Sequence, residues 1–330
     1  MNIGSEPVST LPEEKPESFL QELRSYWDQV PNKILFFSLL SAWLVLFQFW
    51  GNITKGYVNT DSLFSWLYFV YNSSPDDEHG FLIPFVVLVL FWCKRRELID
   101  AVKDIWWPAL GLLIVAMGMH LVGFRVQQTR LSVIGFFLGI WGMLGLVWGK
   151  EFMRRSFFPM FIFIFSVPLG TEADRVTSPL RLLATKISTD FANGIFGLGV
   201  MRDGTRVFDP AGNYQYEVAA ACSGIRSLTA IFAFTTIYSF LKFQKNWKRA
   251  LIIFAAFPLA IVSNVFRLLM IIFAANISGQ NAGNFVHENW FLSLLPYIPA
   301  IFGVMAIGYL LRECSPDASQ SSITSQARHA

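Results

Sequence analysis

The chain has 330 residues, of which 54% are hydrophobic and only 15% are charged, with 33 Phe and 11 Trp. This composition excludes an ordinary soluble domain and indicates a polytopic membrane protein. The formal net charge of +3 gives no basis for nucleic-acid binding. Three scattered cysteines and four histidines without ligand spacing argue against a disulfide framework and a metal site, and we expect no cofactor.

Apolar segments predict an all-α membrane domain between two polar tails. Residues 1–32 are rich in acidic side chains and lack a basic start, so we expect a cytoplasmic tail rather than a cleavable signal peptide. A short tail, 313–330, follows the membrane domain of 33–312. About eight segments of that domain are apolar enough to cross roughly 30 Å of hydrocarbon as helices. They are 33–50, 80–93, 106–123, 131–148, 156–170, 225–241, 250–274 and 290–311.

The distribution of Lys and Arg predicts the orientation of these helices. Basic clusters at 94–103, 150–155 and 242–249 alternate with loops that are poor in basic residues. Because cytoplasmic loops carry an excess of Lys and Arg, these clusters and both tails are expected in the cytoplasm. The sequence therefore predicts a multi-pass protein of the cell membrane.

The long segment before the sixth helix is expected outside the cytoplasm. Its first part has the helical spacing of Leu, Ile and Phe that is typical of an amphipathic helix lying on the membrane surface. Its second part alternates apolar and polar residues around Asp203-Gly204 and 211–213, which predicts a β-hairpin. An open sheet edge cannot face lipid, so the hairpin is expected at or above the outer interface.

A cysteine follows this hairpin directly, in the stretch ACSGIRSL at 221–228. If the sixth helix begins near Ser223, Cys222 lies at its first turn, where free N–H groups and the helix dipole favour a thiolate. Gly224 allows close backbone approach, and Arg226 adds positive charge. Cys222 is thus either an inert buried cysteine or a nucleophile.

The seventh helix carries Asn264 and Arg267, which are three residues apart and share one face. A charged side chain inside a membrane helix costs roughly 3 kcal/mol at the centre. Arg267 either extends to the interface as a lone cation or belongs to a polar site that includes Asn264. Its distance along the helix places it near the outer surface.

His287, in the loop before the eighth helix, is the third candidate. Cys222, Arg267 and His287 belong to three consecutive helices and are all expected at the outer face. A thiolate to attack a carbonyl, an imidazole to carry its proton and a cation to stabilise the oxyanion form a catalytic set. His79 begins the second helix beside Gly80, and either contacts substrate or has a structural role near the helix start.

The motif at 221–228, SNVFR at 263–267 and the histidine before the last helix resemble the exosortase/archaeosortase family of membrane cysteine transpeptidases. The resemblance extends to the His-Gly motif and basic stop at 79–98. It implies that Cys222 is the nucleophile, Arg267 the catalytic arginine and His287 the third member, with Ser223, Gly224, Arg226, Asn264 and His79 supporting them. It further implies substrates that are exported proteins with a C-terminal sorting signal: a Pro-Glu-Pro-like motif, a membrane helix and a basic cluster.

Three other functions compete with this one. A transporter fits eight helices with Pro258 as a possible break, and a non-enzymatic membrane scaffold would not need Cys222. A plain protease would share the thioester and release its product to water. The acceptor, the choice between hydrolysis and transfer, and the oligomeric state are left open by the sequence.

Overall fold

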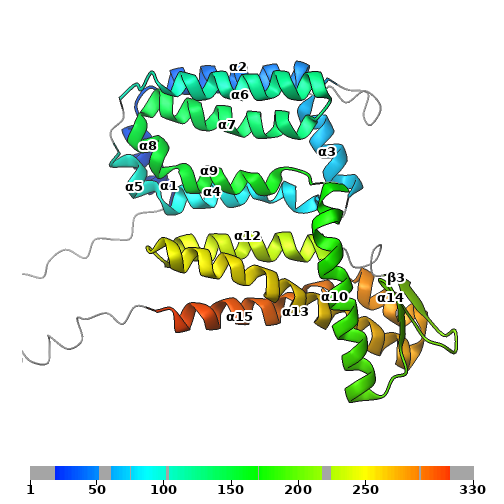
Figure 1. The fold of residues 1–330 in the computed structure, drawn as a ribbon. Helices are drawn as coiled ribbons and strands as arrows, with labels where there is room; N and C mark the ends of the chain where they lie inside the picture. Colours follow the sequence, from blue (N-terminus) through cyan, green and yellow to red (C-terminus); the bar gives the residue numbers. More distant parts are fainter. Residues whose placement is uncertain are drawn as a thin grey trace, which may run out of the picture. The chain divides into compact units, whose positions relative to one another are not determined.

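The computed structural model describes residues 19–51, 61–74, 76–101, 104–169, 171–217, 224–289 and 291–312. This part of the chain is mostly helical and includes one small sheet (Figure 1). The helices, with η marking the 3-10 type, are α1 (Phe19–Gln29), α2 (Lys33–Trp50), α3 (Leu63–Ser73), η1 (Glu78–Phe81), α4 (Ile83–Cys93), α5 (Arg95–Ile99), α6 (Ala109–Val126), α7 (Thr129–Trp148), α8 (Lys150–Arg155), α9 (Phe157–Phe161), η2 (Ile162–Ser166), α10 (Thr171–Phe196), α12 (Gly224–Lys242), α13 (Asn246–Ser278), α14 (Gln280–Glu288), η3 (Leu292–Leu294) and α15 (Tyr297–Leu310).

Five of the helical segments are long and apolar enough to cross a membrane. They are Lys33–Trp50, Ala109–Val126, Thr129–Trp148, Asn246–Ser278 and Leu292–Leu310. Shorter apolar helices at Ile83–Cys93, Phe157–Ser166 and Leu228–Lys242 occupy the three other predicted positions. The prediction of a mostly helical multi-pass protein is confirmed, while the count of eight crossings stays a prediction.

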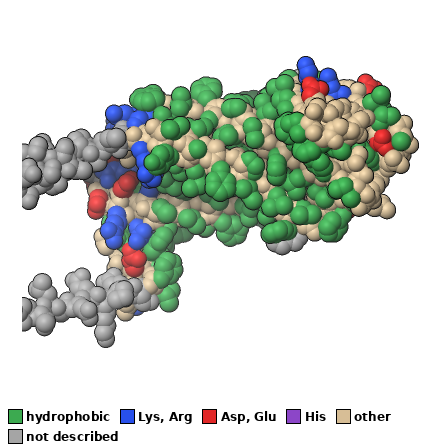
Figure 2. All heavy atoms as spheres, turned by 90° about the horizontal axis from the view of Figure 1, so that it is seen from below, with side chains coloured by type: hydrophobic (Ala, Val, Ile, Leu, Met, Phe, Trp, Pro, Cys, Tyr) green, Lys and Arg blue, Asp and Glu red, His purple; other side chains and the backbone are tan. Residues whose placement is uncertain are grey.

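Exposed hydrophobic side chains agree with a lipid-facing surface. Ile34 and Leu310 are 85% and 81% exposed, and Figure 2 shows hydrophobic side chains covering most of one face. Several buried positions carry hydroxyl groups instead, such as Ser132, Ser239 and Thr235. A surface this apolar is unfavourable in water and suits a hydrocarbon environment.

The chain forms two compact units. The first comprises residues 1–53, 61–63 and 88–160, and the second comprises 54–60, 64–87 and 161–330. In the first unit, α6 and α7 pack closely because glycines of α7 meet neighbouring atoms where a Cβ would clash. Gly135 faces the carbonyl of Ala116 in α6 and Gly139 faces the ring of Trp43 in α2, so these glycines permit close helix packing.

Two of the predicted basic clusters lie at the same end of the first unit. Arg155, the last residue of α8, donates to the carbonyl of Glu97 in α5 at 2.6 Å. Arg95 forms an ion pair with Glu22 of α1 at 2.5 Å. Part of the predicted N-terminal tail is therefore a helix, α1, that packs at this basic end. The grouping agrees with the prediction that 94–103 and 150–155 share one side of the membrane.

The second unit is built around α13, a continuous helix of 33 residues. α10, α12, α14 and α15 pack against it. Lys248, near the start of α13, donates to the carbonyl of Leu311 at 2.8 Å, which brings the third basic cluster to the same end as the last described residues. The other end of α13 carries the sheet and α14.

The sheet has three antiparallel strands in the order β1 (Met201–Asp203), β2 (Arg206–Phe208) and β3 (Gln215–Glu217). β1 and β2 form the hairpin around Asp203-Gly204, where Gly204 has a positive φ of 59°. The buried side chains of Val207 and Tyr216 pack with Leu268 and Ile272 of α13. The sheet is thus fixed to the end of α13 that lies away from the basic cluster at 242–249.

Candidate active site

The described part of the helix that follows the cysteine motif is α12, Gly224–Lys242. Cys222 and Ser223 lie outside the described residues, and so does the side chain of Arg226. In sequence, Cys222 precedes the first residue of α12 by two positions. The nucleophile assignment therefore stays a prediction.

α13 places Asn264 and Arg267 at neighbouring positions on one face, but the two side chains line different cavities. Arg267 is half-buried and lines a cavity of about 890 Å³. Asn264 is 5% exposed and lines a gap of about 10 Å³. Ser263, which precedes Asn264, donates to the carbonyl of Pro296 at 2.7 Å and so fixes the start of α15 to α13.

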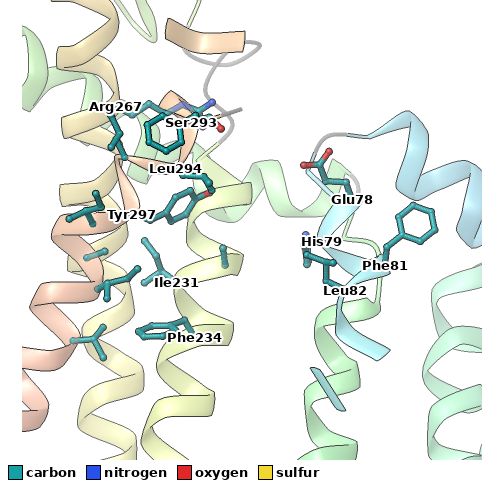
Figure 3. A pocket seen from close by; sticks show the side chains of 17 residues that line it. Glu78, His79, Phe81, Leu82, Ile231, Phe234, Arg267, Ser293, Leu294 and Tyr297 are labelled. Carbon is teal, nitrogen blue, oxygen red and sulfur yellow. The ribbon is translucent and has the colours of Figure 1, made fainter. Parts of the chain in front are cut away.

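The larger cavity is mostly apolar and lies wholly within the second unit. Its walls come from η1, α12, α13, and the segment that leads from η3 into α15. In Figure 3, Glu78 and His79 lie across the cavity from Arg267, Ser293 and Tyr297. The cavity thus presents one arginine and a few polar groups above an apolar interior, an arrangement that is typical of sites for largely apolar ligands.

His79 is held at the cavity wall by contacts of the residues around it. Gly80 lies against the ring of Tyr71, where a Cβ would come within 2.3 Å of a ring carbon. Tyr71 in turn donates to the carbonyl of Ser166, and Asp77 accepts from the N–H of Leu169 at 3.2 Å. Nδ1 of His79 is buried and has no hydrogen-bond partner among the described residues. Gly80 therefore permits the close approach of Tyr71, and His79 lines the same cavity as Arg267.

His287 lies in the last turn of α14 and is half-buried. The sheet fixes this helix, because the side chain of Gln280 pairs with the backbone of Gln215 through two hydrogen bonds, of 2.8 and 2.9 Å. Tyr216 donates to the carbonyl of Gln280 at 2.7 Å, and burial raises the pKa of its phenol. His287 is not among the described residues that line the large cavity.

The structure thus brings some of the predicted residues together. The start of α12, Arg267 and α14 all belong to the second unit, away from its basic cluster at 242–249. Arg267 and His79 share one cavity, while Asn264 faces another and His287 lies on α14. Among the residues that the structure describes, no group of His, Cys, Asp and Glu could hold a metal ion.

Two kinds of lining residue were missed by the sequence analysis. Ser293 and Tyr297 line the large cavity near Arg267, although they occur in an apolar segment without a motif. Arg181 of α10 is 6% exposed and shares the small gap with Asn264. A signal for Arg181 was present, because it lies at four-residue spacing from Thr177 and Thr185, on one face of a helix.

Residues 71–302, more than half of the chain, match the family model described as transmembrane exosortase (Exosortase_EpsH). The chain therefore belongs to the transmembrane exosortase family. This membership makes it a membrane protein-sorting enzyme of the transpeptidase or protease class. No curated protein and no solved structure matches the chain. The matched range includes all the candidate residues from His79 to His287.

Proposed function

We propose that this protein is a membrane cysteine transpeptidase that cleaves C-terminal sorting signals of exported proteins at the outer face of the cell membrane. The observation that carries the proposal is the position of Arg267. It lines a largely apolar cavity walled by α12, whose first described residue comes two positions after Cys222 in the sequence. A cation beside an apolar cavity suits a substrate whose scissile bond adjoins a hydrophobic segment.

In the first half-reaction, the Cys222 thiolate attacks the carbonyl carbon of the scissile peptide bond. The Arg267 guanidinium donates hydrogen bonds to the resulting oxyanion. The C–N bond then breaks, His287 gives a proton to the leaving amine, and a thioester on Cys222 remains.

In the second half-reaction, a nucleophile from a surface acceptor attacks the thioester carbon and loses its proton to His287. The C–S bond breaks and the Cys222 thiolate is regenerated. If water attacks in place of the acceptor, the same steps give hydrolysis. The two outcomes therefore differ in the group that reaches the thioester.

The large cavity is the proposed route for the apolar part of the substrate. Phe81, Leu82, Ile231 and Phe234 line it, and they provide contacts for a hydrophobic helix. Glu78 and His79, on the opposite wall, are proposed to contact the polar segment that precedes this helix. In this arrangement, a signal anchored in lipid presents its cleavage site to Arg267 from the side.

The alternative of a transporter finds less support in α13. A broken helix at Pro258 would be expected at a transport site. The helix instead continues through Pro258 from Asn246 to Ser278. A thirty-three-residue helix is about 50 Å long, which exceeds the hydrocarbon thickness of about 30 Å. The excess length allows its far end to carry the sheet and α14 outside the membrane.

The test is the Cys222→Ala variant, assayed with a tagged exported protein that ends in a Pro-Glu-Pro motif, an apolar helix and a basic cluster. We expect the variant to accumulate in the membrane and leave the reporter uncleaved, because no other group replaces the thiolate. Immunoblotting measures cleavage, and mass spectrometry of the new C-terminus identifies water or a larger acceptor.

Cys93→Ala is the matched control, since Cys93 is exposed at the end of α4 beside the basic cluster. It should process the reporter at the wild-type rate. Normal processing by Cys222→Ala would refute the proposed chemistry.

A further inference from the structure

The short helix α1 separates apolar and polar side chains around its axis. The large apolar side chains on one side are those of Phe19, Leu20, Leu23 and Trp27. The polar side chains on the other side are those of Gln21, Arg24, Ser25 and Asp28. No residue of α1 is buried in the protein. Packing within the first unit therefore does not account for its apolar stripe, which we define as Leu20, Leu23 and Trp27.

α1 is attached to the basic end of the first unit by a third side, between the other two. Glu22 and Tyr26 are four residues apart and hence share one side of the helix. Glu22 forms the ion pair with Arg95 of α5, and the hydroxyl of Tyr26 accepts from Nε of Arg96 at 3.3 Å. The Arg95 guanidinium also lies 4.4 Å from the ring of Trp92. Because these contacts fix the rotation of α1 about its axis, they determine where the apolar stripe points.

The apolar stripe points away from the protein. Leu20, Leu23 and Trp27 are 70%, 41% and 49% exposed. Two leucines and a tryptophan that lie together on an exposed helix face are unfavourable in water and indicate a surface that binds an apolar partner. A tryptophan suits the boundary of a membrane in particular, because its ring is apolar while its N–H group needs a polar partner.

The apolar stripe continues onto the outer surface of α2, the first of the candidate membrane spans. The rings of Trp27 and Phe37 are in contact, with their centroids 5.7 Å apart, and Phe37 is itself 43% exposed. Nζ of Lys33, the first residue of α2, lies 5.3 Å from the centroid of the Trp27 ring. Ile34, beside it, is 85% exposed. The stripe thus extends the lipid-facing surface of α2 at the end where this span begins.

We propose that α1 is an interfacial helix that binds the surface of the lipid bilayer beside α2. Its apolar stripe inserts among the lipids of the leaflet at the basic end of the first unit, and its polar side faces water. The apolar face of such a helix typically lies about 5–10 Å inside the boundary between headgroups and acyl chains. This inference is independent of the proposed function, because it involves no catalytic residue.

Site-directed spin labelling of the full chain measures the depth of the stripe. The enzyme is reconstituted into vesicles of phosphatidylethanolamine and phosphatidylglycerol, and single labels are attached through Leu20→Cys, Leu23→Cys or Ser25→Cys. The native cysteines that are first replaced by alanine are Cys93, Cys222 and Cys314. Collisions of the label with oxygen, which concentrates in lipid, are compared with collisions with a water-soluble nickel complex.

We expect the labels at positions 20 and 23 to lie about 5–10 Å inside the headgroup boundary. Ser25→Cys is the matched control, because Ser25 is exposed on the polar side of the same helix, and its label should lie in water.

A pair of glutamate variants tests whether the apolar stripe holds the helix at the membrane. Leu20→Glu and Gln21→Glu add the same charge at adjacent exposed positions, one in the stripe and one on the polar side. With the label at position 23, Leu20→Glu should shift the label towards water, because a carboxylate resists transfer into an apolar region. Gln21→Glu should leave the depth of the label unchanged. Thermal unfolding checks that both variants are folded.

Three results would overturn the proposal. If the label at position 23 meets the nickel complex as often as the label at position 25 does, α1 lies in water. If it is shielded from both reagents and its spectrum is broadened until unlabelled enzyme is added, a second copy of the chain covers the stripe. If the two glutamate variants have equal effects, the stripe does not hold the helix. Because no measurement here involves cleavage, these results are distinguishable from failure of the proposed function.

Discussion

Arg267 differs in its surroundings from Arg249, an arginine near the other end of α13. Arg249 donates to the carbonyl of Phe243 at 2.7 Å and lies over the ring of Phe240, so its guanidinium has structural partners. For Arg267, the described residues provide no ion pair and no hydrogen bond, although its side chain is half-buried. Its donors are consequently available to a ligand in the large cavity, as an oxyanion-binding role requires.

The shape of the guanidinium gives a sharp prediction for Arg267→Lys. If Arg267 only extended to the interface, Lys would replace it well, because both side chains are long cations. A planar fork that binds an oxyanion is not reproduced by an ammonium group. We expect a loss of about a hundredfold in reporter cleavage, corresponding to about 3 kcal/mol.

Immunoblotting of the uncleaved reporter measures this loss, with enzyme abundance checked in the same membranes. Arg125→Lys, at the exposed end of α6, is the matched control and should be neutral. Cleavage by Arg267→Lys at the wild-type rate would remove Arg267 from the proposed mechanism.

At the scale of elements, the position of His287 depends on how α14 meets the sheet. Gly283 is one turn before His287 and lies against Tyr216, whose hydroxyl would be 2.1 Å from an added Cβ. Tyr216 cannot withdraw without losing its hydrogen bond to Gln280. The glycine therefore keeps α14 close to β3, and through it holds His287 in place.

We predict that Gly283→Ala shifts α14 and lowers both stability and activity. Overpacking of this kind costs about 1–3 kcal/mol, which should appear as a lower unfolding temperature and slower reporter cleavage. Gly194→Ala is the control, because Gly194 is also helical and its added Cβ would meet nothing within 4 Å. It should be neutral or slightly stabilising. If the unfolding temperature of Gly283→Ala equals that of the wild type, Tyr216 moves away from position 283 without a loss of stability, which contradicts this prediction.

The elements also show what could be predicted from the sequence. The five long apolar helices were predicted because each contains a run of apolar residues that is long enough to cross the hydrocarbon core of a membrane. α3 was missed because its eleven residues are too few for a crossing, and α1 because it lies in a polar segment. β3 follows the second predicted turn, at 211–213, and pairs with β2, while its contact with the Gln280 side chain, 65 residues away in sequence, could not be predicted.

The sequence predicted those features of the site that depend on the positions of residues within a single helix. Spacing placed Asn264 and Arg267 on a shared face, and the structure agrees. Their assignment to different cavities depends on α10 and α15, whose packing no local pattern encodes. The same reason explains why Arg181 was missed, because its proximity to Asn264 is a long-range contact.

At the scale of the whole molecule, each unit has a basic end. In the first unit, α5 and α8 meet there. In the second, the loop 242–249 and Leu311 meet there, and the sheet and α14 lie at the other end of α13. If the basic ends face the cytoplasm, the sheet, α14 and the start of α12 all face outside. The proposed mechanism requires this orientation, because exported substrates arrive at the outer face.

Reporter fusions test the orientation directly. A reporter enzyme that is active only outside the cytoplasm should be active when fused after Gly212, in the turn between β2 and β3, or after Asn281, in α14. It should be silent after Arg155, at the end of α8, or after Trp247, at the start of α13. A second reporter, active only in the cytoplasm, should give the reverse pattern, and immunoblotting of each fusion excludes differences in abundance.

The opposite pattern at Gly212 and Trp247 would place the start of α12, and with it Cys222, in the cytoplasm. Arg267 would then face a compartment in which the proposed substrates do not occur, and the mechanism would have to be abandoned.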